Sequence, residues 1–456
     1  MTATIVWLRE DLRLADQPAF AAAAREGGVI PVYVLDDETP RHRRIGSAQR
    51  WWLHHSLASL DADLRKRGSR LILRRGVAAD VLADLVAETG AERVHALRHY
   101  APWWRNAERA LGGKVDLVLH DGVCLLPPGE VRTGAGDLYK IFTPFWRALR
   151  DRMPPAASIP APERLTVAEA WPASDTLEDW ALLPARPDWA GGFNVWTPGE
   201  TGALERLEAF LPNVAAYDAT RNLPSEEGVS YLSPHLHFGE ISVAEVWRRA
   251  AARPGAEPFL RELAWRDYAQ NVILARPDYG KANGLPAFDP FPWRDIADPD
   301  VAADFRAWCR GETGYPIVDA GMRELWATGW MHNRVRMIAA SFLVKHLLID
   351  WREGERWFWD TLVDADYGSN SVNWQWTAGT GIDANMFVRI MAPLTQSEKF
   401  GAADYIRRWV PELSDLGDAV IHDPDDHDAR PAAYPEKRIG HRAARERALA
   451  ALSTIR

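Results

Sequence analysis

Stretches in the second half of the chain hold side chains whose types and spacing could do chemistry. In ELAWRDY, Glu262, Trp265 and Arg266 stand at i, i+3 and i+4, so a carboxylate, an indole and a guanidinium share one helix face. In NSVNWQWTAGTG, Trp374 and Trp376 flank a single residue and therefore face different neighbours. Taken alone, a surface salt bridge over a packed tryptophan and a tryptophan-rich core are the simpler explanations of these patterns.

A further stretch, GWMHNRVRMIAAS at residues 329–341, predicts a buried helix that carries polar groups. With a helical period, Trp330, Asn333 and Met337 share one stripe, and Arg336 lies beside them. Buried amide and guanidinium groups need partners, and this helix supplies none of its own. We therefore expect a polar group from outside the helix to lie against it.

The composition of the chain limits the classes of protein to consider. The 456 residues, 47% of them hydrophobic, allow two or three folded domains. We expect a cytoplasmic protein, since no apolar run is long enough to span a membrane and the first residues lack a signal-peptide pattern. The two cysteines lack zinc-site spacing, which predicts no metal site. A net charge of -9 argues against indiscriminate nucleic-acid binding, although local basic surface remains open.

The order of apolar patterns predicts an α/β domain followed by an all-α domain. Five buried strands are expected in the first 120 residues, namely TIVWLR, VIPVYVLD, RLILRRG, RVHALRHY and KVDLVLHDG. With helical patterns between them, they predict a doubly wound parallel sheet over residues 1–130, without a G-x-G-x-x-G fingerprint. The proline-rich, irregular residues 131–202 predict an interdomain linker, and residues 203–456 predict a helical domain.

Together these stretches resemble the photolyase and cryptochrome family of blue-light flavoproteins. The resemblance covers nearly the whole chain, through the following motifs: VWLREDLRLAD, YKIFTPFWRAL, SYLSPHLHFGEIS, ELAWRDY, TGYPIVDAGMRELWATGWMHNRVRM, DWREGERWFWDTLVDAD, NWQWTAGTG and QSEKF. The stretch ANMFVRIMAPLTQSEKF is most similar to class III cyclobutane pyrimidine dimer photolyases. The resemblance implies that the polar partner of the buried helix is FAD, held in a U shape by the helical domain.

The resemblance also implies a set of FAD contacts. Those near the diphosphate and ribitol would be Tyr217, Ser230, Leu232 and Ser233, and those around the ring Arg266, Trp330, Asn333, Arg336, Asp364, Asp366 and Asn370. Arg336, paired with Asp364, would stabilise negative charge on the reduced flavin, and Asn370 would face the flavin N5. Val229 stands where many relatives carry threonine, which puts one phosphate contact in doubt.

The implied substrate is UV-damaged DNA, with a pyrimidine dimer flipped out into a cavity over the flavin. Photolyases are themselves a standing example of base flipping, so this step comes with the resemblance. The cavity residues implied in repair are Glu262, Trp265, Asn333, Met337, Asn370 and Trp376. Trp265 and Trp376 would stack on the flipped bases, and Glu262 would hydrogen-bond the pyrimidine edge. Arg334 and Arg389 would contact the DNA backbone.

The implied reaction is a light-driven carbon–carbon lyase cycle without net redox change. Excited reduced FAD would give an electron to the dimer, the cyclobutane ring would split, and the electron would return. Trp374, Trp351 and Trp293 would relay electrons from the protein surface when FAD is reduced. The outer position of Trp293 stays open, since another tryptophan could occupy it.

Two other functions within the resemblance are weighed against dimer repair. A blue-light sensing cryptochrome would typically carry Asp at the positions of Asn370 and Asn333, and Tyr at that of Trp376. A photolyase for (6-4) lesions would be expected to show a histidine pair in WMHNRVRM, where only one histidine stands. Both comparisons favour repair of cyclobutane dimers.

The resemblance further implies an antenna chromophore in the α/β domain, 5,10-methenyltetrahydrofolate, and a monomeric protein. The stretches RWWLHHS and HYAPWW are aromatic candidates for antenna contacts. Packing of helices and strands explains them at least as well.

Overall fold

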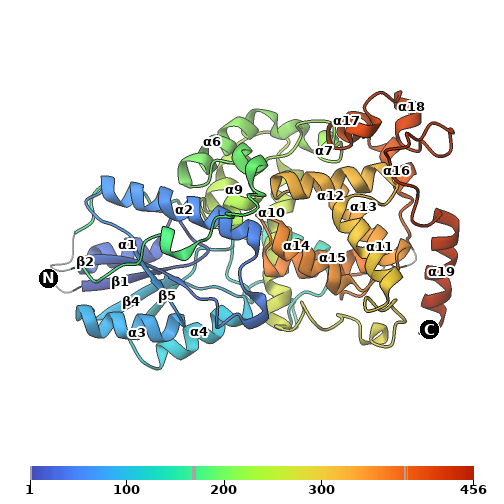
Figure 1. Cartoon of the computed structure of the whole chain (residues 1–456). Coiled ribbons are helices and arrows are strands. Elements are labelled where there is room, and N and C mark those ends of the chain that lie inside the picture. The colour runs from blue at the N-terminus through green and yellow to red at the C-terminus, as the bar shows by residue number, and fades with distance from the viewer. Residues whose placement is uncertain (1–2, 167–170, 385–386, 388, 456) are drawn as a thin grey trace.

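Five short apolar strands form one parallel sheet at the N-terminal end of the computed structural model (Figure 1), which describes residues 3–166, 171–384, 387 and 389–455. The strands are β1 (Ala3–Leu8), β2 (Gly28–Leu35), β3 (Ile72–Arg75), β4 (Arg93–Leu97) and β5 (Leu117–His120), in the order β3-β2-β1-β4-β5. The first two are buried along their whole length, as parallel strands with both faces covered should be. The predicted five-stranded parallel sheet is confirmed.

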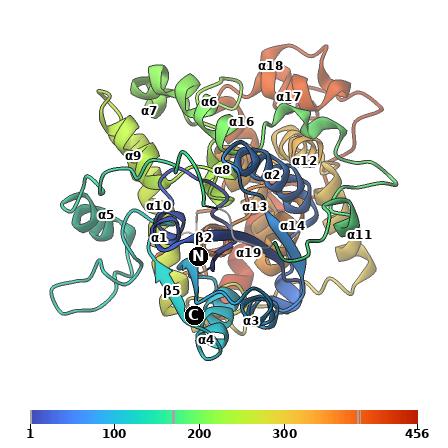
Figure 2. The ribbon, with the colours of Figure 1, turned by 90° about the vertical axis from the view of Figure 1, so that its left-hand side faces the viewer.

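Helices cover both faces of this sheet. They are α1 (Pro18–Glu26), α2 (Ser47–Lys66), α3 (Ala78–Thr89) and α4 (Pro102–Gly112). Alternate residues of β1 enter two separate cores, Ile5 with Leu82 of α3 on one face and Val6 with Leu57 of α2 on the other. Figure 2 shows α2 on one side of the strands and α3 and α4 on the other. The sheet is therefore doubly wound, as expected.

The segment between the sheet and the helical domain is irregular but makes specific contacts. It includes the helix α5 (Phe142–Arg150) and the short 3-10 segments η2 (Glu178–Trp180) and η3 (Gly191–Val195). Phe142 packs flat on Trp265 of the helical domain, with ring centroids 3.6 Å apart. This segment thus contributes to the wall behind a predicted site residue.

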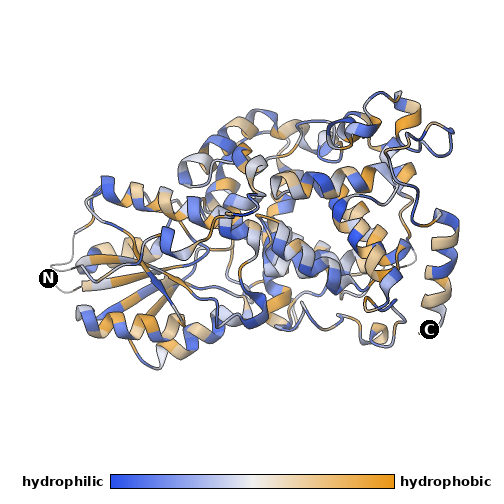
Figure 3. Cartoon of the chain, in the orientation of Figure 1, coloured by the Kyte–Doolittle hydropathy of each residue, from blue (hydrophilic) through white to orange (hydrophobic). Residues whose placement is uncertain are grey.

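The remaining described chain is helical. Its elements are α6 (Glu200–Phe210), η4 (Leu211–Ala216), α7 (Tyr217–Thr220), α8 (Ser233–His237), α9 (Val243–Ala251), α10 (Glu257–Ala275), η5 (Pro286–Phe288), α11 (Pro299–Arg310), α12 (Pro316–Thr328), α13 (Asn333–Ser341), η6 (Phe342–His346), α14 (Trp351–Thr361), α15 (Tyr367–Ala378), α16 (Pro393–Lys399), α17 (Ala403–Trp409), η7 (Pro411–Leu413), α18 (Asp418–Ile421) and α19 (His441–Ser453). The strands are mostly hydrophobic, whereas many of these helices alternate hydrophobic and hydrophilic residues (Figure 3).

The helix predicted over residues 329–341 begins later than predicted, at Asn333. Gly329 ends α12 in a left-handed conformation (φ 69°), and α13 begins only at Asn333. His332 caps this start, since its Nδ1 accepts a hydrogen bond from the backbone N–H of Arg334. The prediction that Trp330 shares a helical stripe with Asn333 and Met337 is therefore wrong: Trp330 lies in the irregular connection between α12 and α13.

The two domains share a core. Trp52 of α2 packs against Trp196 and Phe238, and its indole Nε1 donates to Glu240 Oε1 at 2.9 Å. The start of α2 lies directly against α14, because a Cβ added to Gly46 would stand 2.1 Å from the carbonyl oxygen of Trp359. Among the described residues, no helix combines the length and the apolar character needed to cross a bilayer.

Gly46→Ala tests this close approach. The added methyl group must push the two backbones apart, so we expect the free energy of unfolding to fall by about 1 to 3 kcal/mol, the usual cost of overpacking. Urea unfolding of the purified protein measures it. Gly112→Ala is the matched control, because a Cβ there meets nothing within 4 Å in an ordinary helical position. Equal stability of the two variants would contradict the tight interdomain contact.

Candidate functional site

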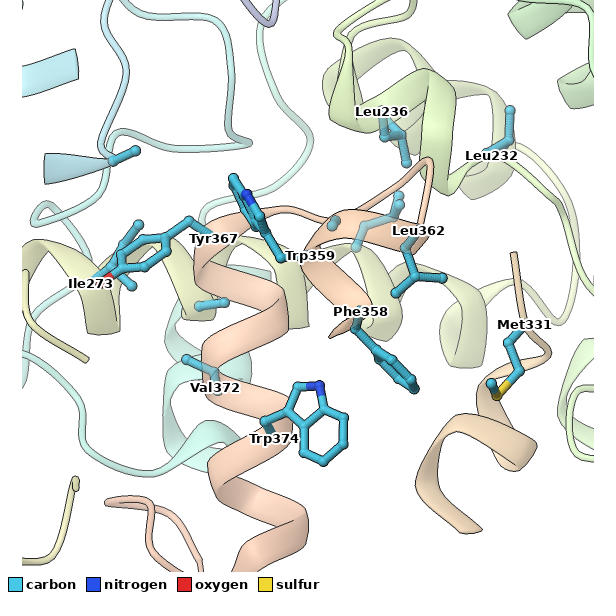
Figure 4. Packing of buried hydrophobic residues seen from close by; sticks show 14 of the residues in the cluster. Leu232, Leu236, Ile273, Met331, Phe358, Trp359, Leu362, Tyr367, Val372 and Trp374 are labelled. Carbon is cyan, nitrogen blue, oxygen red and sulfur yellow. The ribbon is translucent and has the colours of Figure 1, made fainter. Parts of the chain in front are cut away.

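A cavity of about 460 Å³ opens among α10, α13, α14 and α15. The predicted site residues that line it are Ser233, Glu262, Trp265, Arg266, Asn333, Arg334, Arg336, Met337, Asp364, Asp366, Asn370, Trp374 and Trp376. Residues far apart in the sequence therefore meet in one place. Phe358 and Trp374 both line the cavity and pack edge to face against each other, with ring centroids 5.0 Å apart (Figure 4).

An ion pair fixes one side of the cavity. Arg336 donates through Nη1 and Nη2 to the two carboxylate oxygens of Asp364, at 3.0 and 2.8 Å, and through Nε to the carbonyl of Met331. Ser233 donates to the same carboxylate at 2.6 Å, and Trp330 donates through Nε1 to the Ser233 hydroxyl. A bidentate pair of this kind holds the guanidinium plane in one orientation.

A second anchor lies at the start of α15. Asp366 caps that helix by accepting from the backbone N–H of Ser369, and its other oxygen accepts from Gln270 at 2.9 Å. Arg266 donates to the backbone carbonyls of Val123 and Leu236, one preceding and one within the helical domain. The carboxylate of Asp366 and the guanidinium of Arg266 thus line the cavity, and hydrogen bonds to neighbouring residues fix both.

Asn370 is held through its amide nitrogen. Nδ2 donates to the backbone carbonyl of Glu355 at 3.0 Å and to the carboxylate Oε1 of the same residue at 2.9 Å. The Glu355 carboxylate is itself paired with Arg43 of the α/β domain. The side chain is 8% exposed and borders the cavity.

The opposite part of the cavity is aromatic and acidic. Trp265 is half-buried with one ring face covered by Phe142, so its other face is the one available for stacking. Trp376 is also half-buried. Glu262 is paired with Arg221, which lines the same cavity.

Arginines gather near this part. Arg334 is held by Asn222 Oδ1 at 2.7 Å, and its guanidinium lies over the Phe400 ring. Burial lowers the pKa of Arg334, and the charges of Arg221 and Arg389 lower it further. Lys345, from the π-helical turn η6, donates to the backbone carbonyl of Arg389 at 3.1 Å.

Several predicted residues lie outside the cavity lining. Leu232 is fully buried in the core, and Tyr217 packs on Phe210 and Phe259. Ser230 borders a neighbouring surface pocket. Trp330 contacts the site indirectly, through Ser233 and with the Arg336 guanidinium 5.6 Å from its ring centroid.

The three tryptophans predicted for the relay lie in different surroundings. Trp374 lines the cavity, Trp351 is fully buried with its Nε1 bonded to Asn283, and Trp293 is partly buried against Phe291. A further buried indole, Trp308, lies 6.2 Å from Trp374 between ring centroids.

The sequence interpretation missed Arg221, Phe142, Glu355 and Arg43 as parts of the site. Arg221 follows Tyr217 at i+4, a signal too common to single it out. The indoles of RWWLHHS and HYAPWW, proposed as antenna candidates, are core residues: Trp51, Trp52, Trp103 and Trp104 are each at most 8% exposed.

Comparison with known proteins assigns the fold and the cavity to one family. Residues 4–163 match the family model described as DNA photolyase, and residues 259–454 match the FAD binding domain of DNA photolyase. The chain belongs to the DNA photolyase family.

Relatives of this photolyase family member match over more than nine-tenths of its length. It is 47% identical to the deoxyribodipyrimidine photo-lyase of Agrobacterium fabrum, over 99% of this chain and 98% of that one. A crystal structure of a bacterial class III photolyase from Agrobacterium tumefaciens superposes with a TM-score of 0.94 at 46% identity, covering 100% and 98% of the two chains. Cryptochrome-1 of Arabidopsis thaliana is 36% identical over 92% of this chain and 64% of its own length.

The cavity of this photolyase family member suits the FAD that its domain is built to bind. Its volume lies within the range of about 300 to 1,000 Å³ typical of cofactor sites. Its walls offer the guanidinium of Arg336, the carboxylate of Asp366 and the amide of Asn370, and a flavin edge carries both hydrogen-bond donors and acceptors. The donor set and the space both fit the cofactor.

A buried carboxyl group holds the start of α13, the helix that presents Asn333, Arg336 and Met337. Glu324 Oε2 accepts from the backbone N–H of His332 at 3.0 Å and from the Tyr405 hydroxyl at 2.6 Å. Burial raises the pKa of Glu324 from 4.5 to about 7.

This raised pKa predicts a pH-dependent stability. Between pH 4.5 and about 7 the folded protein keeps a proton on Glu324 that the unfolded chain has released, so the free energy of unfolding should fall as the pH rises through this window. Glu324→Gln should flatten that part of the profile in urea unfolding from pH 4.5 to 8. Glu436→Gln, at a side chain 83% exposed, is the control. An unchanged slope in Glu324→Gln would show that this carboxyl group is not responsible.

Proposed function

We propose that the protein repairs cyclobutane pyrimidine dimers in DNA with blue light, as a deoxyribodipyrimidine photo-lyase. One observation carries the proposal: groups suited to a flavin (Arg336, Asp364, Asn370) and groups suited to an unpaired base (Trp265, Trp376) border the same cavity. A flipped dimer and the flavin would therefore be in contact. The likeness to photolyases along the entire chain supports this function.

The residues of the chain bind and orient the reacting groups. The chemistry that FAD would supply when bound in its reduced form is light-driven transfer of one electron to the dimer and its return. Arg336, locked by Asp364, stabilises negative charge beside the flavin ring, and Trp265 and Trp376 hold the flipped bases by stacking. Trp374, Trp351 and Trp293 are proposed to connect the flavin to the surface for its initial reduction.

Glu262 is proposed to hydrogen-bond the edge of the flipped pyrimidine. Its carboxylate is paired with Arg221. A phosphate of the bound strand would draw the guanidinium towards the DNA and leave the carboxylate to the base. Asn333 and Met337 complete the walls around it.

The DNA strand is proposed to lie over Arg221, Arg334 and Arg389. Their positive charge offers phosphate contacts in an otherwise acidic protein. Because such contacts release counterions, affinity for damaged DNA should weaken with rising salt.

A blue-light sensor is the second candidate, favoured by the likeness to Arabidopsis cryptochrome-1. Asn333, Asn370 and Trp376 all border the cavity and favour repair over sensing. For (6-4) lesions, the single histidine of WMHNRVRM caps a helix and is not among the described residues that line the cavity.

The remaining proposals concern the antenna and the state of the protein. We propose 5,10-methenyltetrahydrofolate as the antenna, on the resemblance of the sequence to class III photolyases. A monomer acting in the cytoplasm fits a DNA substrate and two cysteines that are both unpaired.

A repair assay tests the function. Purified protein with chemically reduced FAD is incubated with an oligonucleotide that carries one thymine cyclobutane dimer, and restored thymines are quantified under blue light and in the dark. Restoration only in the light supports repair. If FAD is bound and reduced but no thymines are restored in the light, repair is contradicted and the sensor function is favoured.

Truncating the stacking walls should weaken lesion binding. Trp265→Ala and Trp376→Ala each remove a stacking surface worth about 1 to 3 kcal/mol per base, so the Kd for dimer-containing DNA should rise roughly 5- to 150-fold. FAD absorbance should stay at the level of the unmodified protein. Trp326→Ala is the matched control, since this indole is 52% exposed and away from the cavity lining. Loss of FAD in the wall variants, or unchanged affinity, would contradict the assignment.

A further inference from the structure

One side chain of the α/β domain reaches into the helical domain behind the cavity. Arg43 ends the short turn η1 (Arg41–Arg43) and is only 7% exposed. Its Nη1 lies 2.6 and 2.7 Å from the two carboxylate oxygens of Glu355, and its Nη2 donates to the carbonyl of Gly280 at 2.8 Å. A buried guanidinium with this many acceptors is fixed in place.

The surroundings of Arg43 are shaped for a guanidinium. The group lies over the rings of Tyr367 and Trp359, at 5.3 and 5.7 Å from their centroids, and both rings are labelled in Figure 4. A Cβ on Gly280 would stand 2.9 Å from Nη2, so the glycine leaves the room that the guanidinium occupies. A lysine could not reproduce the two-sided contact.

Glu355 connects Arg43 to Asn370, which borders the cavity. It is fully buried, and its Oε1 accepts both from Arg43 and from Nδ2 of Asn370. Burial raises the pKa of this carboxyl group, and the charge of Arg43 is the main effect that opposes the rise. Without Arg43, the carboxyl group would tend to take up a proton and become a hydrogen-bond donor.

The partners of Asn370 determine which way its amide points. Nδ2 donates to two acceptors, the backbone carbonyl and the carboxylate of Glu355. If the amide were turned over, its oxygen would face these two acceptors, and an oxygen without a hydrogen could bond to neither. The amide oxygen Oδ1 is thus the atom left to face the cavity. A protonated Glu355 could instead donate to Oδ1, and the amide would then be free to turn over.

We propose that Arg43 is a positioning residue for the flavin: by holding Glu355 as a carboxylate, it keeps Oδ1 of Asn370 turned to the cavity as an acceptor. This inference rests on the proposed place of Asn370 opposite the flavin N5. An acceptor there favours flavin that carries a proton on N5, which reduced flavin does and oxidised flavin does not. The α/β domain thereby biases the bound FAD towards its reduced form.

The midpoint potential of bound FAD and its rate of oxidation by air test the proposal in the purified holoprotein. Arg43→Gln should lower the potential and speed oxidation about threefold to tenfold, the range that one hydrogen bond contributes. Arg43→Lys keeps the charge and should give a smaller change in the same direction, and it serves if Arg43→Gln does not retain FAD. In an Asn370→Ala background, the effect of either variant should vanish, because Asn370 transmits it.

Glu108→Gln is the matched control. Glu108 forms another buried pair with an arginine of the same domain, Arg9, at 2.7 Å, and it is absent from the lining of the cavity. An equal change in Glu108→Gln, an unchanged potential in the Arg43 variants, or an undiminished effect in the Asn370→Ala background would overturn the proposal. The readout is the flavin itself, so the result is independent of whether dimers are repaired.

Discussion

The cost of burying a charged group without a partner governs this site. Three polar groups that line the cavity are each held by a second side chain: Arg336 by Asp364, Asp366 by Gln270, and Asn370 by Glu355. These supports cannot be rearranged cheaply, because removing one partner leaves the other buried and unpaired. These pairs hold the three side chains in fixed orientations, which reduces the ordering that binding requires.

The supports also explain why two domains are needed. Arg43 and the start of α2 belong to the α/β domain, yet they contact Glu355, Gly280 and Trp359 behind the cavity. The α/β domain therefore acts as part of the frame of the site in addition to any role with an antenna. A helical domain alone would leave Glu355 buried without its cation.

The sequence predicted the fold and the residues that line the cavity better than the residues that hold them from behind. Apolar runs identified all five strands, and the family resemblance named Arg336 with Asp364. The period of residues 329–341 wrongly included Trp330 in the helix, because the capping by His332 that sets the helix start does not alter the pattern of apolar residues. Arg43 could not be found, since the residues Glu355 and Arg43 are 312 positions apart and only the tertiary fold brings them together.

We propose that one cavity holds the flavin and the flipped dimer in contact. Fluorescence of the reduced, bound FAD measures this most directly, because an electron leaves the excited flavin only for an acceptor at close range. We expect strong quenching by an oligonucleotide with one thymine dimer and none by the undamaged oligonucleotide. Tight binding of the dimer-containing DNA with unchanged flavin emission would place the lesion elsewhere and contradict a shared cavity.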